Sequence, residues 1–197
     1  MNACKVLELV SNDKIEELKG LAELEIKEKE TKEKGGNKEL RRFRAAQRYI
    51  KNIEKKCIAG FNGTWIEDEK QCFSDGYTGF ILENKIDALP QILKPNFDLH
   101  TVLKNIDATK EINVNINEIK TALKIHKSTH RKNKLTCEYN LGISLYNAEY
   151  IVNCYDILGS DVVFKQSETN ELSPAILENQ NGIAILLPIR KNSRASA

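Results

Sequence analysis

The spacing of hydrophobic residues predicts three amphipathic helices after residue 37. In the run 38–56, apolar side chains recur every three or four positions, at Phe43, Ala46, Ile50 and Ile53. One face of this helix is therefore predicted to be buried, and the rest of its surface is basic. A second helix is predicted over Glu118–His130, with Asn117 as its N-cap. The third is predicted over Asn147–Gly159, with four residues on one buried face: Tyr150, Ile151, Cys154, Ile157.

The segments around these helices show the composition and alternation of β-strands. The predicted strands are 61–66, 71–74, 78–82, 111–116, 135–139, 142–146, 161–165, 173–177 and 182–190. Residues 86–98 contain Pro90 and Pro95, which predicts a connector, and a short helix is expected at 99–104.

One helix combined with several strands recurs three times along the chain, over 38–82, 111–146 and 147–190. This order predicts an α+β fold of repeated helix-plus-antiparallel-strand units. Residues 1–34 are highly charged and predict a helical extension, which ends at the flexible joint 35–37. The expected organisation is an extension and linker at 1–37, a first partial domain at 38–105, a C-terminal domain at 106–191 and a flexible tail at 192–197.

The end of the last predicted strand carries the most distinctive pattern in the chain. Proline cannot donate a hydrogen bond to a sheet, so Pro188 is predicted to lie where the strand leaves its sheet. Leu187, Pro188 and Ile189 would then form an apolar ledge at the edge of the domain, beside Arg190. A last strand that simply frays would produce the same pattern.

Composition narrows the class of protein without identifying it. The 197 residues carry a formal net charge of +2, and no apolar run approaches the ~18 residues needed to span a membrane. The first residues lack the basic-then-apolar layout of a secretory signal. The cysteines are odd in number, scattered and without a C-x-x-C pair, at Cys4, Cys57, Cys72, Cys137 and Cys154. This usage is expected of reduced thiols in a cytoplasmic protein, and no membrane partner is expected.

Two of the predicted helices are strongly basic. Lysine and arginine bind the DNA backbone by releasing counterions, which makes double-stranded DNA a candidate partner. The candidate DNA-binding residues are Arg41, Arg42, Arg44, Arg48, Lys51, Lys55, Lys120, Lys124, Lys127 and Arg131. No base-reading module is visible, and the same basic groups could instead pair with the acidic side chains of the N-terminal extension.

No arrangement of residues predicts catalysis. His126 and His130 have the i, i+4 spacing of a zinc pair, but Lys127 follows His126 where a metalloprotease needs glutamate, so solvent-facing histidines are expected. Ser74 and Asp75 have no histidine near them in the sequence, and phosphate-binding and dinucleotide-binding loops are missing. We therefore expect no cofactor, no bound metal and no enzymatic activity.

Two segments together resemble a known family. Residues 147–190 run from a helix through a strand and a Ser-Pro-containing strand to the end Leu-Pro-Ile-Arg, and an earlier segment has the sequence Phe73-Ser74-Asp75-Gly76-Tyr77-Thr78. The first resembles the C-terminal end, with its Pro-x-Arg, of the bacterial DNA polymerase III β subunit, the sliding clamp. The second resembles the Thr-Asp-Gly-aromatic-Arg segment of that family, although alone it predicts only a hairpin turn.

The resemblance is best over 111–190 and weaker over 38–85. It implies a clamp fold, with helices lining a DNA hole and sheets forming the outer wall. It also implies that the two segments line one interdomain cleft, which holds a short peptide with a glutamine followed by hydrophobic residues. Such peptides belong to polymerases and other replication and repair proteins. The implied peptide-binding residues are Ser74, Asp75, Gly76, Tyr77, Thr78, Pro174, Leu187, Pro188, Ile189 and Arg190.

The chain also departs from the family pattern. Thr78 stands where the family usually has an arginine, residues 191–197 continue past the usual end, and the chain is much shorter than a three-domain clamp subunit. Ring closure is therefore not implied, although a homo-oligomer could complete a ring. The leading hypothesis is a reduced clamp-like replication protein of a phage or mobile element. The alternatives are a sequence-independent DNA-binding protein without the peptide pocket, or a decoy that inhibits a host clamp.

Overall fold

The computed structural model describes residues 38–55, 61–130 and 135–190. The predicted N-terminal extension and C-terminal tail lie outside these ranges, as does Arg131 of the candidate DNA-binding set.

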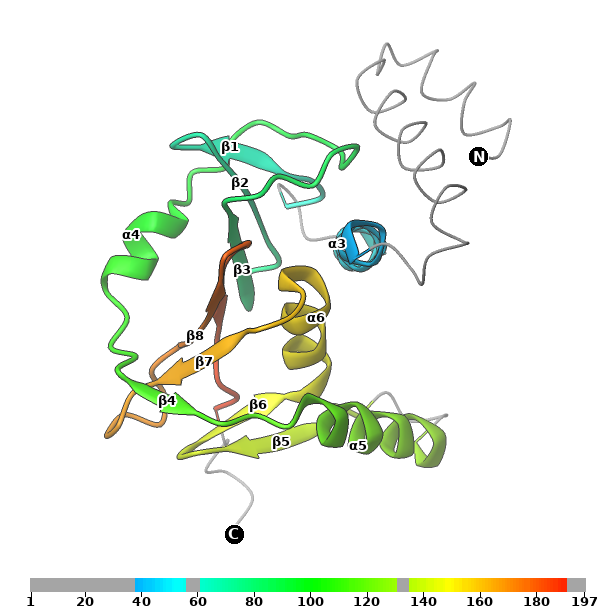
Figure 1. The fold of residues 1–197 in the computed structure, drawn as a ribbon, viewed down its shortest axis with the longest axis vertical. Helices are drawn as coiled ribbons and strands as arrows, with labels where there is room; N and C mark the ends of the chain where they lie inside the picture. Colours follow the sequence, from blue (N-terminus) through cyan, green and yellow to red (C-terminus); the bar gives the residue numbers. More distant parts are fainter. Residues whose placement is uncertain (1–37, 56–60, 131–134, 191–197) are drawn as a thin grey trace, which may run out of the picture.

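A seven-stranded sheet, with all neighbouring strands antiparallel, forms the centre of the molecule (Figure 1). In spatial order its strands are β1 (Trp65–Glu67), β2 (Lys70–Ser74), β3 (Thr78–Leu82), β9 (Gly182–Leu186), β8 (Ala175–Asn179), β7 (Val163–Gln166) and β4 (Lys110–Ile112). A separate two-stranded sheet is made of β5 (Glu138–Leu141) and β6 (Ser144–Asn147). The pairing of β3 with β9 joins the strands β1 to β3 to the last strands of the chain in one sheet.

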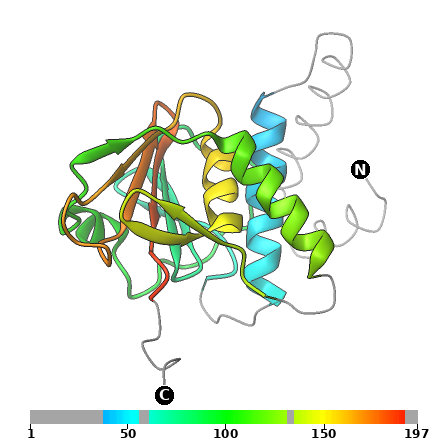
Figure 2. The same ribbon diagram turned by 90° about the horizontal axis from the view of Figure 1, so that it is seen from below.

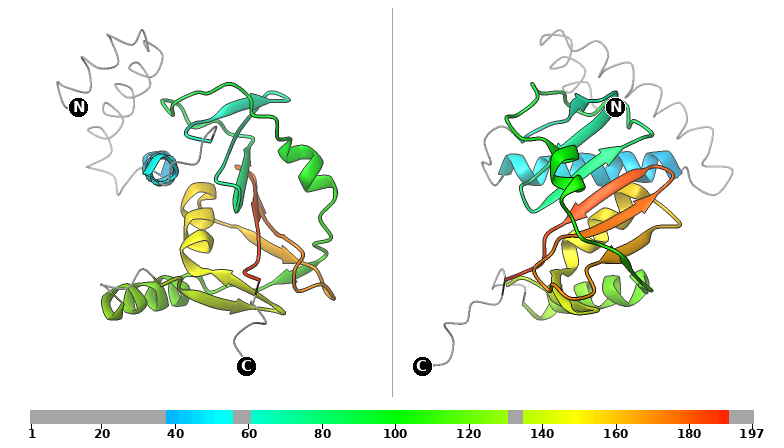
Figure 3. Two further views of the ribbon diagram at one scale, coloured as in Figure 1. Left: turned by 180° about the vertical axis from the view of Figure 1, so that it is seen from behind. Right: turned by 90° about the vertical axis from the view of Figure 1, so that its left-hand side faces the viewer.

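Helices cover both faces of the large sheet. The helices α3 (Lys38–Lys55), α5 (Ile116–Thr129) and α6 (Ala148–Leu158) lie together on one side, as Figure 2 shows. The short α4 (Leu99–Lys104) lies on the opposite face of the sheet, in front of the strands in the right-hand view of Figure 3. There the side chain of Leu99 occupies the space that a Cβ on Gly79 would need, so a glycine lets α4 approach β3 closely.

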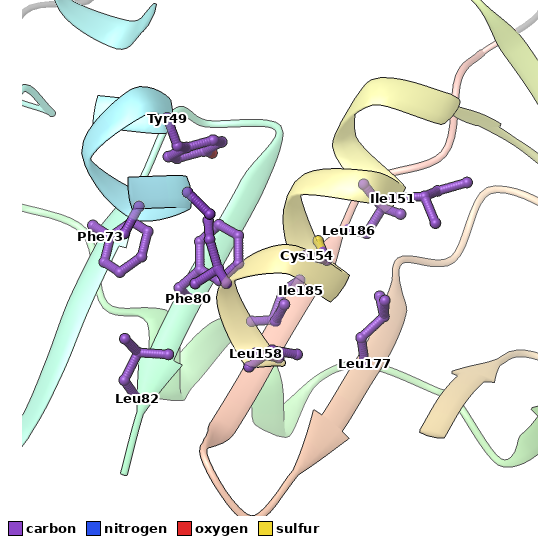
Figure 4. Close-up of a cluster of buried hydrophobic side chains, with 14 of the residues drawn as sticks. Tyr49, Phe73, Phe80, Leu82, Ile151, Cys154, Leu158, Leu177, Ile185 and Leu186 are labelled. Atoms are coloured by element: carbon purple, nitrogen blue, oxygen red, sulfur yellow. The ribbon is translucent and has the colours of Figure 1, made fainter. Parts of the chain in front are cut away.

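The core lies between the sheet and the pair α3 and α6 (Figure 4). Phe73 and Phe80 stack at 4.6 Å between ring centroids, and Tyr49 of α3 meets Phe80 edge-on at 5.3 Å. On the α6 side the buried residues are Ile151, Cys154, Leu158, Leu177, Ile185 and Leu186. Burying each large apolar side chain contributes about 1.5–3 kcal/mol, so this cluster holds both helices on the sheet.

The predicted α+β class with an antiparallel sheet is confirmed. The last strand ends at Leu186 and not at the predicted residue 190, and Pro188 lies just beyond the sheet, where the chain leaves it, as predicted. Local boundaries differ where turn chemistry decides them. α5 begins at Ile116 because Asn115, and not Asn117, is its N-cap: Asn115 Oδ1 accepts a hydrogen bond from Asn117 N at 3.2 Å.

Further boundaries were wrong. The predicted strand 61–66 begins only at Trp65, in β1. The predicted strand 111–116 shrinks to β4, and the predicted pair 135–139 and 142–146 moves to β5 and β6, because Gly142 takes up the turn with a φ of +57°. The second predicted unit also does not form one sheet, since β4 pairs with β7 while β5 and β6 pair with each other. The division into domains at residue 105 remains a prediction.

Candidate functional site

The turn between β2 and β3 and the segment after β9 lie side by side. Thr78 is paired with Leu186 in the sheet, and immediately beyond this pair Leu187 N donates to Tyr77 O at 3.0 Å. The two segments that were singled out in the sequence, more than 100 residues apart, therefore share one surface. The pairing of β3 with β9 brings them together.

The segment 187–190 leaves the large sheet and reaches the small one. Ile189 N donates to Leu145 O of β6 at 2.7 Å, so the backbone is held at both ends of the short apolar run. Leu187 is 37% exposed, Pro188 and Ile189 are half-buried, and Arg190 is exposed. We call Leu187, Pro188 and Ile189 the apolar ledge. It presents hydrophobic side chains on a backbone that is already hydrogen-bonded.

Pro174 also belongs to this surface. Ala175 is paired with Leu186 in the antiparallel pair of β8 and β9, so the preceding residue Pro174 lies next to Leu187. Its ring is half-buried. Strand register thus brings together residues from three parts of the chain.

Three residues of the β2–β3 turn are buried and serve the turn itself. Ser74, Asp75 and Thr78 are each at most 3% exposed. Asp75 Oδ1 accepts from the backbone N–H of Tyr77 at 3.0 Å and of Thr78 at 2.8 Å. Ser74 Oγ donates to Thr78 O at 2.9 Å and accepts from Gly76 N at 3.0 Å. These side chains shape the turn, and a partner would meet Gly76 and Tyr77, which are exposed.

An aromatic pair completes the surface, and only one of its members, Tyr77, was assigned to the site from the sequence. Tyr77, 58% exposed, stacks on Tyr150 of α6 with ring centroids 6.2 Å apart and an interplanar angle of 17°. Burial, followed by the charge and hydrogen bond of Asp75, raises the pKa of Tyr150 well above its usual value. We call Tyr77 and Tyr150 the aromatic pair. The sequence placed Tyr150 only on a buried helix face, because a contact between residues this far apart leaves no local signal.

The candidate DNA-binding residues on α3 divide into two groups. Five are exposed and recur every three or four residues along one face, opposite the buried face: Arg41, Arg44, Arg48, Lys51, Lys55. We call these five residues the basic stripe. At about 1.5 Å of rise per residue it extends over about 21 Å.

Arg42 does not belong to the stripe. It is 8% exposed, its Nε donates to Ile157 O at 2.9 Å and its Nη2 donates to Asn84 O at 3.3 Å. Its guanidinium therefore serves the contact between α3 and the end of α6, and we withdraw it from the DNA-binding candidates.

Two of the three candidate lysines on α5 pair with carboxylates of α6. Lys120 pairs with Asp156 at 2.7 Å and Lys127 with Glu149 at 2.8 Å, both at the surface. Lys124 is exposed. Two of these three lysines therefore already have anionic partners within the protein.

The two histidines of α5 stack on each other, with ring centroids 4.4 Å apart. His126 Nε2 lies 3.0 Å from Leu135 O, and His130 Nδ1 lies 3.3 Å from His126 O. Within the described ranges, no group of three or more metal-binding side chains gathers anywhere.

A hollow of about 410 Å³ lies at the other end of β9 from the apolar ledge. Glu83, Asp161 and Glu178 are among its lining residues. It is separate from the surface described above and has an acidic lining.

These features define an α+β protein with a helix-covered antiparallel sheet and an exposed ledge where its last strand ends. No protein-family model matches the chain, and no curated protein matches it. Among solved structures it is similar to the β clamp of Helicobacter pylori bound to a DNA ligase peptide, with a TM-score of 0.36 and 16% sequence identity. The match covers 64% of this chain and 42% of the clamp chain. In the part of the chain that the structure describes, no helix has the length and hydrophobicity to cross a membrane.

Proposed function

We propose that this protein is a sliding-clamp-like accessory protein of DNA replication that docks short linear peptides of replication or repair proteins. The observation that carries the proposal is the juxtaposition of the β2–β3 turn with the apolar ledge. These are the two segments whose sequences resemble the peptide-binding segments of sliding clamps. The ledge supplies half-exposed hydrophobic side chains, and Arg190 beside it is an exposed donor for a polar or acidic group of the peptide.

The geometry suits a modest, motif-type affinity. A partner's hydrophobic side chain would cover Leu187, Pro188 and Ile189, whose backbone needs no rearrangement because Leu187 N and Ile189 N are already bonded. A small apolar anchor on a preformed surface is the usual basis of linear-motif binding. Thr78 is buried within the turn, so the contact that an arginine makes at this position in sliding clamps is missing or is replaced by other groups.

Fluorescence anisotropy tests the proposal directly. The probe is a labelled peptide with a glutamine followed by leucine and phenylalanine residues, and its control has these hydrophobic residues replaced by alanine. We expect saturable binding of the probe alone. Pro188→Ala with Ile189→Ala removes about 2 kcal/mol of apolar contact and should weaken binding by roughly 30-fold. Ile125→Ala, which truncates a 59% exposed isoleucine on α5, is the matched control and should bind normally. Equal affinities of the double variant and the wild type would refute the proposal.

A second activity, contact with double-stranded DNA, is favoured by the basic stripe. Its five cations extend over about 21 Å and would lie alongside a duplex that carries one phosphate per ~1.7 Å of axis. If three to five of them contact phosphates, log K should fall with log salt at a slope of about −3 to −4.5. Charge reversal by Arg41→Glu, Arg44→Glu and Arg48→Glu should abolish binding. Lys120→Ala with Lys127→Ala should have little effect, because both lysines are paired internally. A salt-independent affinity would exclude this activity.

A further inference from the structure

Beneath the aromatic pair lies a buried polar network centred on Asp75. Asp75 is 3% exposed, and no ion pair of its carboxylate with a lysine or arginine forms within the described ranges. A buried carboxylate is costly unless hydrogen-bond donors surround it. Here the donors are two backbone N–H groups of its own turn and the hydroxyl of Tyr150.

Helix α3 contributes to the same network. Tyr49, 3% exposed, donates from its hydroxyl to Thr78 O at 3.1 Å. The same carbonyl accepts from Asp75 N at 3.1 Å and from Ser74 Oγ at 2.9 Å. Burial, and after it the negative charge of Asp75, raises the pKa of Tyr49 well above its usual value, so the phenol remains a hydrogen-bond donor. The turn is therefore held from below by α3 and α6 at once.

The network bears directly on the exposed aromatic pair. Tyr150 is bound through its hydroxyl, and its ring stacks on Tyr77, the residue whose carbonyl accepts from Leu187 N. Fixing the hydroxyl fixes the plane of the Tyr150 ring, which in turn supports the half-exposed ring of Tyr77 beside the apolar ledge.

We propose that Asp75 is a positioning residue of the peptide-docking surface, which anchors Tyr150 and so holds the aromatic pair as a wall beside Leu187. This inference rests on the proposed function, because the wall matters only where a peptide docks. It assigns the bound peptide a hydrophobic side chain that packs between the aromatic pair and the ledge. Asp75 itself does not touch the peptide.

Tyr150→Phe tests the inference, since it removes the anchoring hydroxyl and keeps the ring. We expect the probe peptide to bind roughly five- to tenfold more weakly, the loss of one charge-assisted hydrogen bond. Asp75→Asn should weaken binding in the same way, and because it keeps every tyrosine, it should also weaken the near-ultraviolet circular dichroism of the tyrosine side chains. Tyr155→Phe is the matched control, because this half-buried tyrosine lies on the same helix and its pKa is raised by burial and by Cys154, not by Asp75. It should leave the affinity for the probe peptide unchanged.

The outcomes separate this inference from the proposed function. If Tyr150→Phe binds the probe within twofold of the wild type while Pro188→Ala with Ile189→Ala abolishes binding, docking stands and the positioning role is overturned. If the wild type binds no probe, the proposed function fails, and the dichroism of Asp75→Asn alone decides whether Asp75 orients the aromatic pair. An unchanged tyrosine signal in Asp75→Asn would overturn that orientation too. Should Asp75→Asn fail to fold, Tyr150→Phe alone decides.

Discussion

Arg41 and Arg42 are neighbours in sequence with opposite expected roles, and substituting each by alanine tests the division of α3 into two faces. Arg42 is buried and bonded to two carbonyl oxygens, Ile157 O and Asn84 O. Ile157 lies in the last turn of α6, where the carbonyls have no partner within the helix. A cation there also interacts favourably with the helix dipole. Arg42→Ala removes all of these interactions at once.

The expected magnitude can be worked out from the two hydrogen bonds that the guanidinium of Arg42 donates. A hydrogen bond to a charged group contributes about 1.5–3 kcal/mol, and the Nη2 bond, at 3.3 Å, is the weaker of the two. Removing both, and leaving Ile157 O without its donor, should lower the free energy of unfolding by about 3 kcal/mol. With a urea slope of about 2 kcal/mol/M, the unfolding midpoint should fall by about 1.5 M.

The assay is urea unfolding followed by far-ultraviolet circular dichroism, combined with DNA binding under conditions where each variant is folded. Arg41→Ala should change the free energy of unfolding by less than about 0.5 kcal/mol, because the side chain is exposed, and should weaken DNA binding. Arg42→Ala should lower the free energy of unfolding and leave the DNA binding of the folded protein unchanged. Arg42→Lys, which keeps the charge but loses the planar fork, should lie between Arg42→Ala and the wild type in stability. Equal urea midpoints for the two alanine variants would refute the division.

Two further predictions concern the interior. Gly182 has a φ of +144°, and a Cβ there would collide with Ile81 O, so Gly182→Ala should lower the free energy of unfolding, measured by thermal denaturation, by about 2 kcal/mol or more. Gly76 has a φ of +82° and open space around it, so Gly76→Ala should lower the same free energy by only about 1 kcal/mol. Burial raises the pKa of Cys72 from 9.0 to about 12, so alkylation at pH 8 mapped by mass spectrometry should spare Cys72 in the native protein and modify it in urea. The pKa of the Cys72 thiol is higher in the folded state than in the unfolded state, so its contribution to the free energy of unfolding is complete below pH 9. This contribution should decline between pH 9 and 12, as the thiol ionises in the unfolded state.

Hydrophobic spacing was sufficient to predict the helices and most strands, since each depends on neighbours within the element. The spacing also held a signal for Arg42 that the sequence analysis passed over. Arg42 precedes Ala46, Tyr49 and Ile53 by four, seven and eleven positions, which places it on the buried face of α3. Charge alone grouped it with the exposed arginines.

The contacts that build the candidate site were less accessible from sequence. The adjacency of the two site segments was expected only through the family resemblance, because the pairing of β3 with β9 joins strands about 100 residues apart. The ion pairs of α5 with α6 and the stacking of Tyr77 on Tyr150 likewise depend on how elements pack. Local patterns describe elements, and these features exist only between elements.

Helix α3 links the two proposed surfaces through its opposite faces. Its outer face carries the basic stripe, while Tyr49 on its inner face holds the turn beside the apolar ledge. Substitutions on the outer face, such as Arg48→Ala, do not touch that turn, so they should affect DNA binding without changing peptide affinity. Tyr49→Phe removes the hydrogen bond to Thr78 O from the inside and should weaken peptide binding while leaving the stripe exposed. The two activities are thus separable by substitutions one residue apart on the same helix.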